Sequence, residues 1–202
     1  WCLGCGLVLV LAPLLSDTVL RAYVALTDAH PFAAGFCKFA LLATFGESLA
    51  QRMLTGSYLP PRFGLVPRAL AWGALGVCIT LAFMIFSGGV PLAMSRSGMD
   101  WAARALAGPL GTEKLLTAFA ISVSLNTLFA PVLMVAHKVS DLHIARYEGT
   151  LRCLWHLPDV GGLLRAVNWE VMWRLVLFRT VIFFWIPAHT VTLLLPEAFR
   201  VL

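Results

Sequence analysis

The chain has 202 residues, of which 60% are hydrophobic and only 12% are charged, and its mean hydropathy is +0.86. A soluble domain of this length could not hide so much apolar surface from water, so lipid must cover part of the molecule. The same composition excludes a disordered chain, a coiled coil and a secreted disulfide scaffold. The net charge of +5 arises from basic residues between apolar runs. Such residues are typical of topology signals facing lipid headgroups, not of nucleic-acid binding.

The N-terminal part of the sequence predicts two short elements before the first full span. Residues 1–15 form an apolar run that is too short to cross a bilayer alone, so we interpret it as a partial segment. Residues 16–18, Ser-Asp-Thr, then predict the cap of a short interfacial helix. That helix would carry Tyr23 and end at His30-Pro31.

Four long apolar segments follow, at about residues 31–54, 65–86, 115–136 and 168–195. Each is long enough, at about 1.5 Å per residue, to cross a hydrocarbon core of about 30 Å. Glycine and proline interrupt the sequence after the first two, and Pro187 predicts a kink in the last. Because lipid leaves unpaired backbone groups unsatisfied, these segments must be helices. The predicted fold is all-α: one polytopic membrane helical bundle over residues 1–202, with about four full transmembrane helices and a partial N-terminal one.

Basic residues predict which loops share a side of the membrane. Eight of them flank residues 55–64 and 137–168, whereas five lie at the opposite ends of the spans. This bias places both regions inside. The polar stretch 137–168 is expected to be an interfacial loop in the form of an interfacial helix, with Leu151, Leu154 and Trp155 facing lipid. Gly73 and Gly76 are expected to be helix-packing surfaces.

Polar side chains within the spans are the candidate functional residues, because a charge at the bilayer centre costs at least about 2.5–3.5 kcal/mol. Glu47 is the only acid well inside a predicted span, and Gln51 lies four residues later on the same helix face. We expect Glu47 to pair with Arg174 or Arg179, with Gln51 and Asn126 completing the network. Such a network would either line a solute pathway or join helices.

Other chemistry has little support in the sequence. Cys2 and Cys5 have redox spacing, but no thioredoxin-like context surrounds them. The five histidines form no metal-binding pattern, and no glycine-rich phosphate loop or nucleophile elbow occurs. We therefore expect no catalytic residue, no metal and no cofactor.

One pattern is more specific than composition. Tyr23 precedes His30-Pro31 by seven residues, Gly46-Glu47 begins fifteen after the proline, and Gln51 follows four after the glutamate. This pattern resembles the N-terminal half of the peroxisomal 22 kDa membrane protein family, which includes mitochondrial inner-membrane relatives and has aspartate at the glutamate position.

The C-terminal half resembles the same family more loosely. It contains Asn168-Trp169, Trp173 and Pro187, but these match only with shifts of one or two residues. The family's glutamine and asparagine in the last span have no counterpart. The resemblance implies a bundle of about four spans without enzyme activity, of a kind proposed to form small channels. It carries over Gly46, Glu47 and Gln51, and with the shifts Trp173 and Pro187.

These observations favour a small channel or solute-permeability protein that is not an enzyme. Two alternatives stay open: a non-catalytic structural or assembly subunit of a larger membrane complex, and a membrane thiol oxidoreductase using Cys2 and Cys5. Expected partners are membrane lipid and either further copies of the chain or other membrane subunits, with no nucleic acid. The low lysine content favours a bacterial inner membrane over a mitochondrial inner or peroxisomal one.

Overall fold

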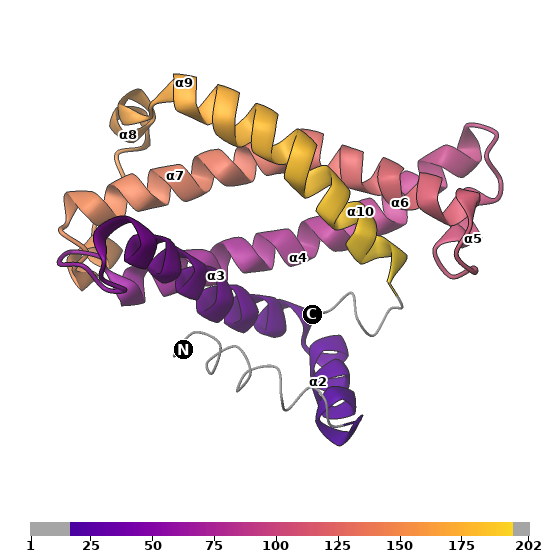
Figure 1. The fold of residues 1–202 in the computed structure, drawn as a ribbon, viewed down its shortest axis with the longest axis horizontal. Helices are drawn as coiled ribbons and strands as arrows, with labels where there is room; N and C mark the ends of the chain where they lie inside the picture. The colour runs from indigo at the N-terminus through magenta and orange to yellow at the C-terminus, as the bar shows by residue number, and fades with distance from the viewer. Residues whose placement is uncertain (1–16, 196–202) are drawn as a thin grey trace.

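The computed structural model describes residues 17–195, and this part of the chain is all-helical (Figure 1). Four helices are long and apolar enough to cross a membrane: Pro31–Thr55, Leu65–Arg96, Thr112–Arg146 and Trp169–Leu194. The predicted class, a polytopic membrane helical bundle with four full spans, is confirmed. The predicted partial segment at residues 1–15 lies outside the described residues, as do Cys2 and Cys5.

Helix α2 (Asp17–Ala29) leads into the first span, α3 (Pro31–Thr55). Pro31 occupies the first turn of α3, where its missing N–H and fixed φ cost nothing. Gly56 ends α3 in the left-handed conformation, with φ of 80°, and its N–H bonds to the Arg52 carbonyl. Glycine is favoured there because it has no Cβ. The predicted boundary at His30-Pro31 is therefore correct.

Small residues join α3 to α4 (Leu65–Arg96), the most extensive helix pairing in the described structure. Gly73 and Gly76 are buried against α3, where Gly76 lies against Gly35 and Gly73 lies against the Phe36 ring. A methyl group added at Gly76 would lie 2.6 Å from the Gly35 carbonyl oxygen, closer than real carbon contacts allow. The predicted packing role of Gly73 and Gly76 is confirmed.

Helix α4 continues past the predicted end at Phe86. It passes through Gly88, Gly89 and Pro91 and ends at Arg96. Proline inside a membrane helix is tolerated because neighbouring helices and local adjustments satisfy the freed carbonyl, and Pro91 is buried among such neighbours. These glycines and the proline therefore do not mark the end of α4, and the predicted end at Phe86 is wrong.

The third span is also longer than predicted. It comprises α6 (Thr112–Ser124), a π-helical turn η2 (Leu125–Phe129) and α7 (Ala130–Arg146). His137 and Asp141 do not end the helix, because they bond to Glu47 of α3 and Arg68 of α4. The predicted loop 137–168 is thus wrong over its first ten positions and begins only after Arg146. It then contains the 3₁₀ turn η3 (Leu151–Trp155) and α8 (Val160–Ala166).

The last span starts at α9 (Trp169–Val171), where the Asn168 side chain caps the helix by accepting the Val171 N–H at 3.1 Å. It continues as the π-helical segment η4 (Met172–Trp185) and ends as α10 (Ile186–Leu194). Pro187 lies in the first turn of α10, where π-helical bonding changes to α-helical bonding. The predicted irregularity therefore coincides with a change in helix type.

Helix α4 and the α6–α7 helix form the centre of the molecule (Figure 1). Helix α3 packs on α4, and α10 packs on α6, where Ala118, Ile121 and Leu193 form a buried cluster. Short helix α5 (Ala102–Ala105) packs between α4 and α6. This order leaves the first and last spans on the outside of the bundle.

Two loops meet at one end of the bundle. Gly64, before α4, lies against the backbone of Gly149, after α7, and both have positive φ. Arg62 and Glu148 form an exposed ion pair at 3.2 Å beside them. Residues 55–64 and the loop after α7 therefore share one end, as the distribution of basic residues predicts.

Candidate functional site

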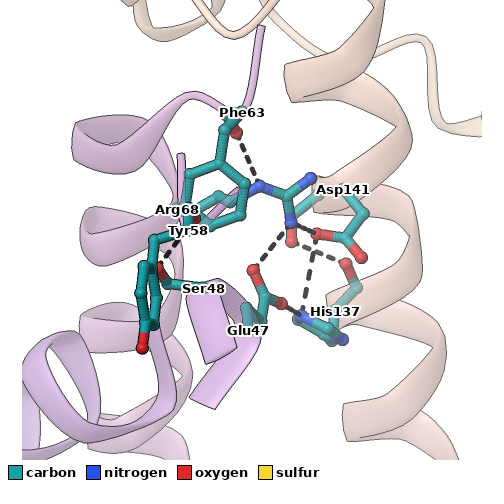
Figure 2. A network of polar contacts seen from close by, with 8 residues as sticks. Glu47, Ser48, Tyr58, Phe63, Arg68, His137 and Asp141 are labelled. Carbon is teal, nitrogen blue, oxygen red and sulfur yellow. Dashed lines mark hydrogen bonds and ion pairs between the residues drawn. The ribbon is translucent and has the colours of Figure 1, made fainter. Parts of the chain in front are cut away.

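Arg68 is the centre of a charged cluster formed by three spans (Figure 2). It lies in the first turn of α4, where its backbone N–H bonds to the Gly64 carbonyl. Its Nη1 donates to Glu47 Oε2 on α3 at 2.8 Å and to Asp141 Oδ1 on α7 at 2.6 Å. Its Nε donates to the Phe63 carbonyl at 2.7 Å, and the Phe63 ring lies 5.0 Å from the guanidinium. The Arg68 guanidinium is therefore fixed between the two carboxylates and the Phe63 carbonyl.

His137 links the same carboxylates from α7. It lies one turn before Asp141, and its Nε2 is 2.8 Å from Glu47 Oε1 and 3.7 Å from Asp141 Oδ1. Because an ionised carboxylate only accepts hydrogen bonds, His137 carries a hydrogen on Nε2 and donates a hydrogen bond from it to Glu47 Oε1. The Trp72 ring covers the imidazole, with centroids 4.2 Å apart. We call Glu47, Arg68, His137 and Asp141 the charged cluster.

The charged cluster has an imbalance of charge. Two carboxylates share a single guanidinium, so the formal charge is −1 when His137 is neutral and zero when it is protonated. All four side chains are mostly buried, with 17–21% of each exposed. Glu47 lies eight residues before the end of α3, about 12 Å along the helix. The cluster thus lies toward the end of the bundle where the two loops meet.

The geometry of the cluster does not fit a resident metal ion. The ligand atoms of Glu47, His137 and Asp141 lie within 4.8 Å of one another, close enough to hold one. The guanidinium of Arg68, however, is bonded to both carboxylates and anchored by Phe63. A metal ion coordinated by all three ligands would face this fixed positive charge at short range, so Arg68 takes the place of a tightly held ion and leaves at most one negative charge in the cluster.

The predicted pairing of Glu47 with Arg174 or Arg179 is wrong. Arg174 pairs with Glu170, one turn earlier, at 3.0 Å on an exposed surface. Arg179 is exposed, and its side chain has no hydrogen bond or ion pair within the described part of the chain. Both lie on η4, on the outside of the bundle, whereas Glu47 faces α4 and α7. The Gln51 side chain also lies outside the charged cluster; the Gln51 carbonyl accepts the Thr55 hydroxyl.

Asn126 forms a separate polar site near the middle of the third span. It is 1% exposed, and its Nδ2 donates to the Ser122 carbonyl at 2.8 Å and to His189 Nδ1 at 2.9 Å. His189 must therefore carry its proton on Nε2 when it is neutral. The rings of Phe83 and Trp185 lie 5.2 and 5.3 Å from the imidazole. Asn126 is thus involved in interhelical bonding, but with α10 and not with Glu47.

The positions matched to the family are scattered over the structure. Tyr23 and His30 lie at α2 and its end, and Pro31 starts α3. A methyl group added at Gly46 would meet no atom within 4 Å. Trp173 is exposed, and Pro187 lies in α10. Glu47 is the one matched position that belongs to the charged cluster.

Sequence reasoning missed three of the four cluster residues. Arg68 counted as a topology signal, and His137 and Asp141 fell in the predicted loop. The four-residue spacing of His137 and Asp141, which places both on one helix face, was the pattern that could have indicated them. Comparison of the chain with protein-family models, curated proteins and solved structures finds no match. The family resemblance therefore rests only on the residues quoted above.

Proposed function

We propose that this chain is a small permeability protein that prefers cations, with the charged cluster as the binding station at one end of its path. The observation that carries the proposal is the shared guanidinium: Arg68 bonds both carboxylates, so the four-residue cluster carries one negative charge whenever His137 is neutral. Rings of acidic side chains attract cations in the same way at the mouths of cation channels. A small cation or a proton is the favoured solute.

The energetics of the cluster favour this role over helix adhesion alone. Charges within membrane helices are costly, and they mark ion paths or proton relays by default. Replacing a buried ion pair by packed apolar residues is often neutral or stabilising, so stability alone is weak grounds for keeping four ionisable groups. The small residues at Gly35, Gly73 and Gly76 already join α3 to α4.

The path we propose follows the inner stripe of the third span. Asn126 and His137 are eleven residues apart, which places them on one face and about 16 Å apart along the axis. Ala130 and Leu133 lie between them and are buried. The route would thus join a central polar site to the charged cluster through a short apolar stretch. One chain offers only a narrow path, so a further copy would complete its wall.

The membrane in which the protein resides is also part of this proposal. The arginine-rich, lysine-poor basic residues favour a bacterial inner membrane, with the loops at 56–64 and 147–168 on the cytoplasmic side.

Flux through liposomes tests the proposal. Purified protein would be reconstituted and the fluxes of K⁺, H⁺ and Cl⁻ compared. Glu47→Gln and Asp141→Asn remove a cluster charge, and we expect each to lower cation flux relative to anion flux. Glu170→Gln is the matched control, because Glu170 is exposed on the outer helix and pairs with Arg174. Absence of flux from folded protein, or equal effects of Glu47→Gln and Glu170→Gln, would overturn the proposal.

A second candidate function is that of a non-catalytic subunit in a larger membrane complex. It is favoured by the exposure of three spans, in each of which only 17% of the most apolar window is buried within the chain. Lipid or partner helices must cover the rest. This function predicts a stoichiometric companion on purification in mild detergent, and a chain purified alone with full flux activity would exclude it.

The thiol oxidoreductase alternative gains no support from the described residues. Their three cysteines, Cys37, Cys78 and Cys153, are free. Burial raises the pKa of the Cys153 thiol, which disfavours the reactive thiolate.

A further inference from the structure

An apolar groove lies on the side of α4 and α7 beside the loop that follows α7, and none of the four charged-cluster side chains lines it. Its volume is about 610 Å³, within the range of about 300–1,000 Å³ typical of small-molecule sites. The lining is almost entirely aliphatic and comes from four elements, α4, α7, η3 and α8. Its walls include Leu70, Ala71, Val135, Val139, Leu154 and Val160. Such a lining suits a hydrocarbon chain.

Positive charge gathers at the rim of the groove. Asp159, next to the lining residue Val160, lies 3.7 Å from the guanidinium of Arg146. Arg165 acts on the same carboxylate, since the Gly162 N–H and then both arginines hold the pKa of Asp159 below its usual value. Arg146 and Arg165 together carry one positive charge more than the single Asp159 carboxylate, so a net positive charge remains at the exposed rim for an anion.

The segment around the groove has the composition of a membrane interface. Leu151, Leu154, Trp155 and Leu157 are exposed, with Trp155 at 84%. They alternate with Arg152 and the exposed His156. Exposed tryptophan and leucine beside arginine are typical of chain at the headgroup level. The groove would then begin at the depth where acyl chains meet headgroups.

We propose that this groove binds an acyl chain of an anionic phospholipid whose phosphate lies against Arg146 and Arg165. A lipid is favoured over soluble phosphate because the apolar lining needs a hydrocarbon occupant. An anionic lipid is favoured over a zwitterionic one because the rim has excess positive charge, and each basic residue near a membrane surface contributes attraction of about 1 kcal/mol. This site is independent of the proposed permeability.

Native mass spectrometry of the full chain in detergent tests the site. Phosphatidylglycerol and phosphatidylcholine with identical acyl chains would be added in equal amounts and retained adducts counted. We expect preferential retention of phosphatidylglycerol, falling about fivefold for each of Arg146→Gln and Arg165→Gln. Arg96→Gln is the matched control, because Arg96 is an exposed arginine at the opposite end of α4. Equal retention of the two lipids, or an equal effect of Arg96→Gln, would overturn the proposal.

Two further arms test the hydrocarbon part. Ala71→Phe would fill the groove and is expected to reduce retention of phosphatidylglycerol; the arginine variants, at exposed positions, give an independent result if this variant does not fold. Glycerol 3-phosphate, which has the phosphate without the chains, is expected not to displace the lipid. Displacement by glycerol 3-phosphate at the same concentration would show recognition of phosphate alone and would contradict the lipid site.

Discussion

Replacing Arg68 by methionine is the most informative perturbation of the charged cluster. The substitution keeps an unbranched apolar stem but removes the guanidinium that Glu47 and Asp141 share. The two carboxylate oxygens bonded to Nη1, at 2.8 and 2.6 Å, lie within roughly 5 Å of each other. At an effective dielectric constant of about 20, two negative charges at that distance repel by about 3 kcal/mol. Together with the lost attraction, we expect a destabilisation of about 3–5 kcal/mol.

The assay is equilibrium unfolding in detergent, followed by circular dichroism. Arg62→Met is the matched control, because Arg62 pairs with Glu148 on an exposed surface and its loss should cost less than about 1 kcal/mol. Adding Asp141→Asn to the Arg68→Met variant should recover part of the loss, because it removes the repulsion. The reasoning is refuted if Arg68→Met costs no more than Arg62→Met, or if the effects of Arg68→Met and Asp141→Asn are additive within about 0.5 kcal/mol.

Three further predictions follow from the fold. Gly76→Ala should destabilise by about 1–3 kcal/mol in the same assay, because its methyl group would lie 2.6 Å from a backbone carbonyl of α3; Gly88→Ala, with no neighbour within 4 Å, should be neutral or stabilising. Asn126→Leu should cost about 0.6–1.7 kcal/mol through loss of its bond to α10, and no loss would show that this bond is not stabilising. The hydrogen bond from the Gly162 N–H lowers the pKa of Asp159 in the folded protein. The stability that Asp159 gives α8 as its cap should therefore be fully present above the unfolded-state pKa of Asp159 and be lost as pH falls through its lowered folded-state pKa. Amide hydrogen exchange of α8 should show this loss of protection in the wild type and not in Asp159→Ala.

Hydropathy predicted the fold class because the bilayer imposes it. Long apolar segments must be helices in lipid, and their number is read directly from the sequence. Helix ends were harder to predict, because proline and polar residues act as stop signals only in water-exposed chain. Pro91 is buried inside α4, and His137 and Asp141 extend α7 by bonding to its neighbours.

Only one residue of the charged cluster could be predicted from the sequence. Glu47 stood out because an acid within a span is expensive. The partners of Glu47 did not stand out, because the depth of a residue along a helix does not show which neighbouring helix its side chain faces. Arg179 has a comparable depth but lies on the outer helix, whereas Arg68, at the start of α4, reaches inward. Only the packing of α3, α4 and α7 places the cluster.

The reversal potential in a planar bilayer under a tenfold KCl gradient tests the central claim most directly. A cation-preferring path shifts it toward the potassium equilibrium potential, whose magnitude is about 59 mV. We predict this shift for the wild type and for Glu170→Gln, and a shift toward zero for Glu47→Gln and Asp141→Asn. No conductance from folded protein, or one reversal potential shared by all four proteins, would contradict the claim.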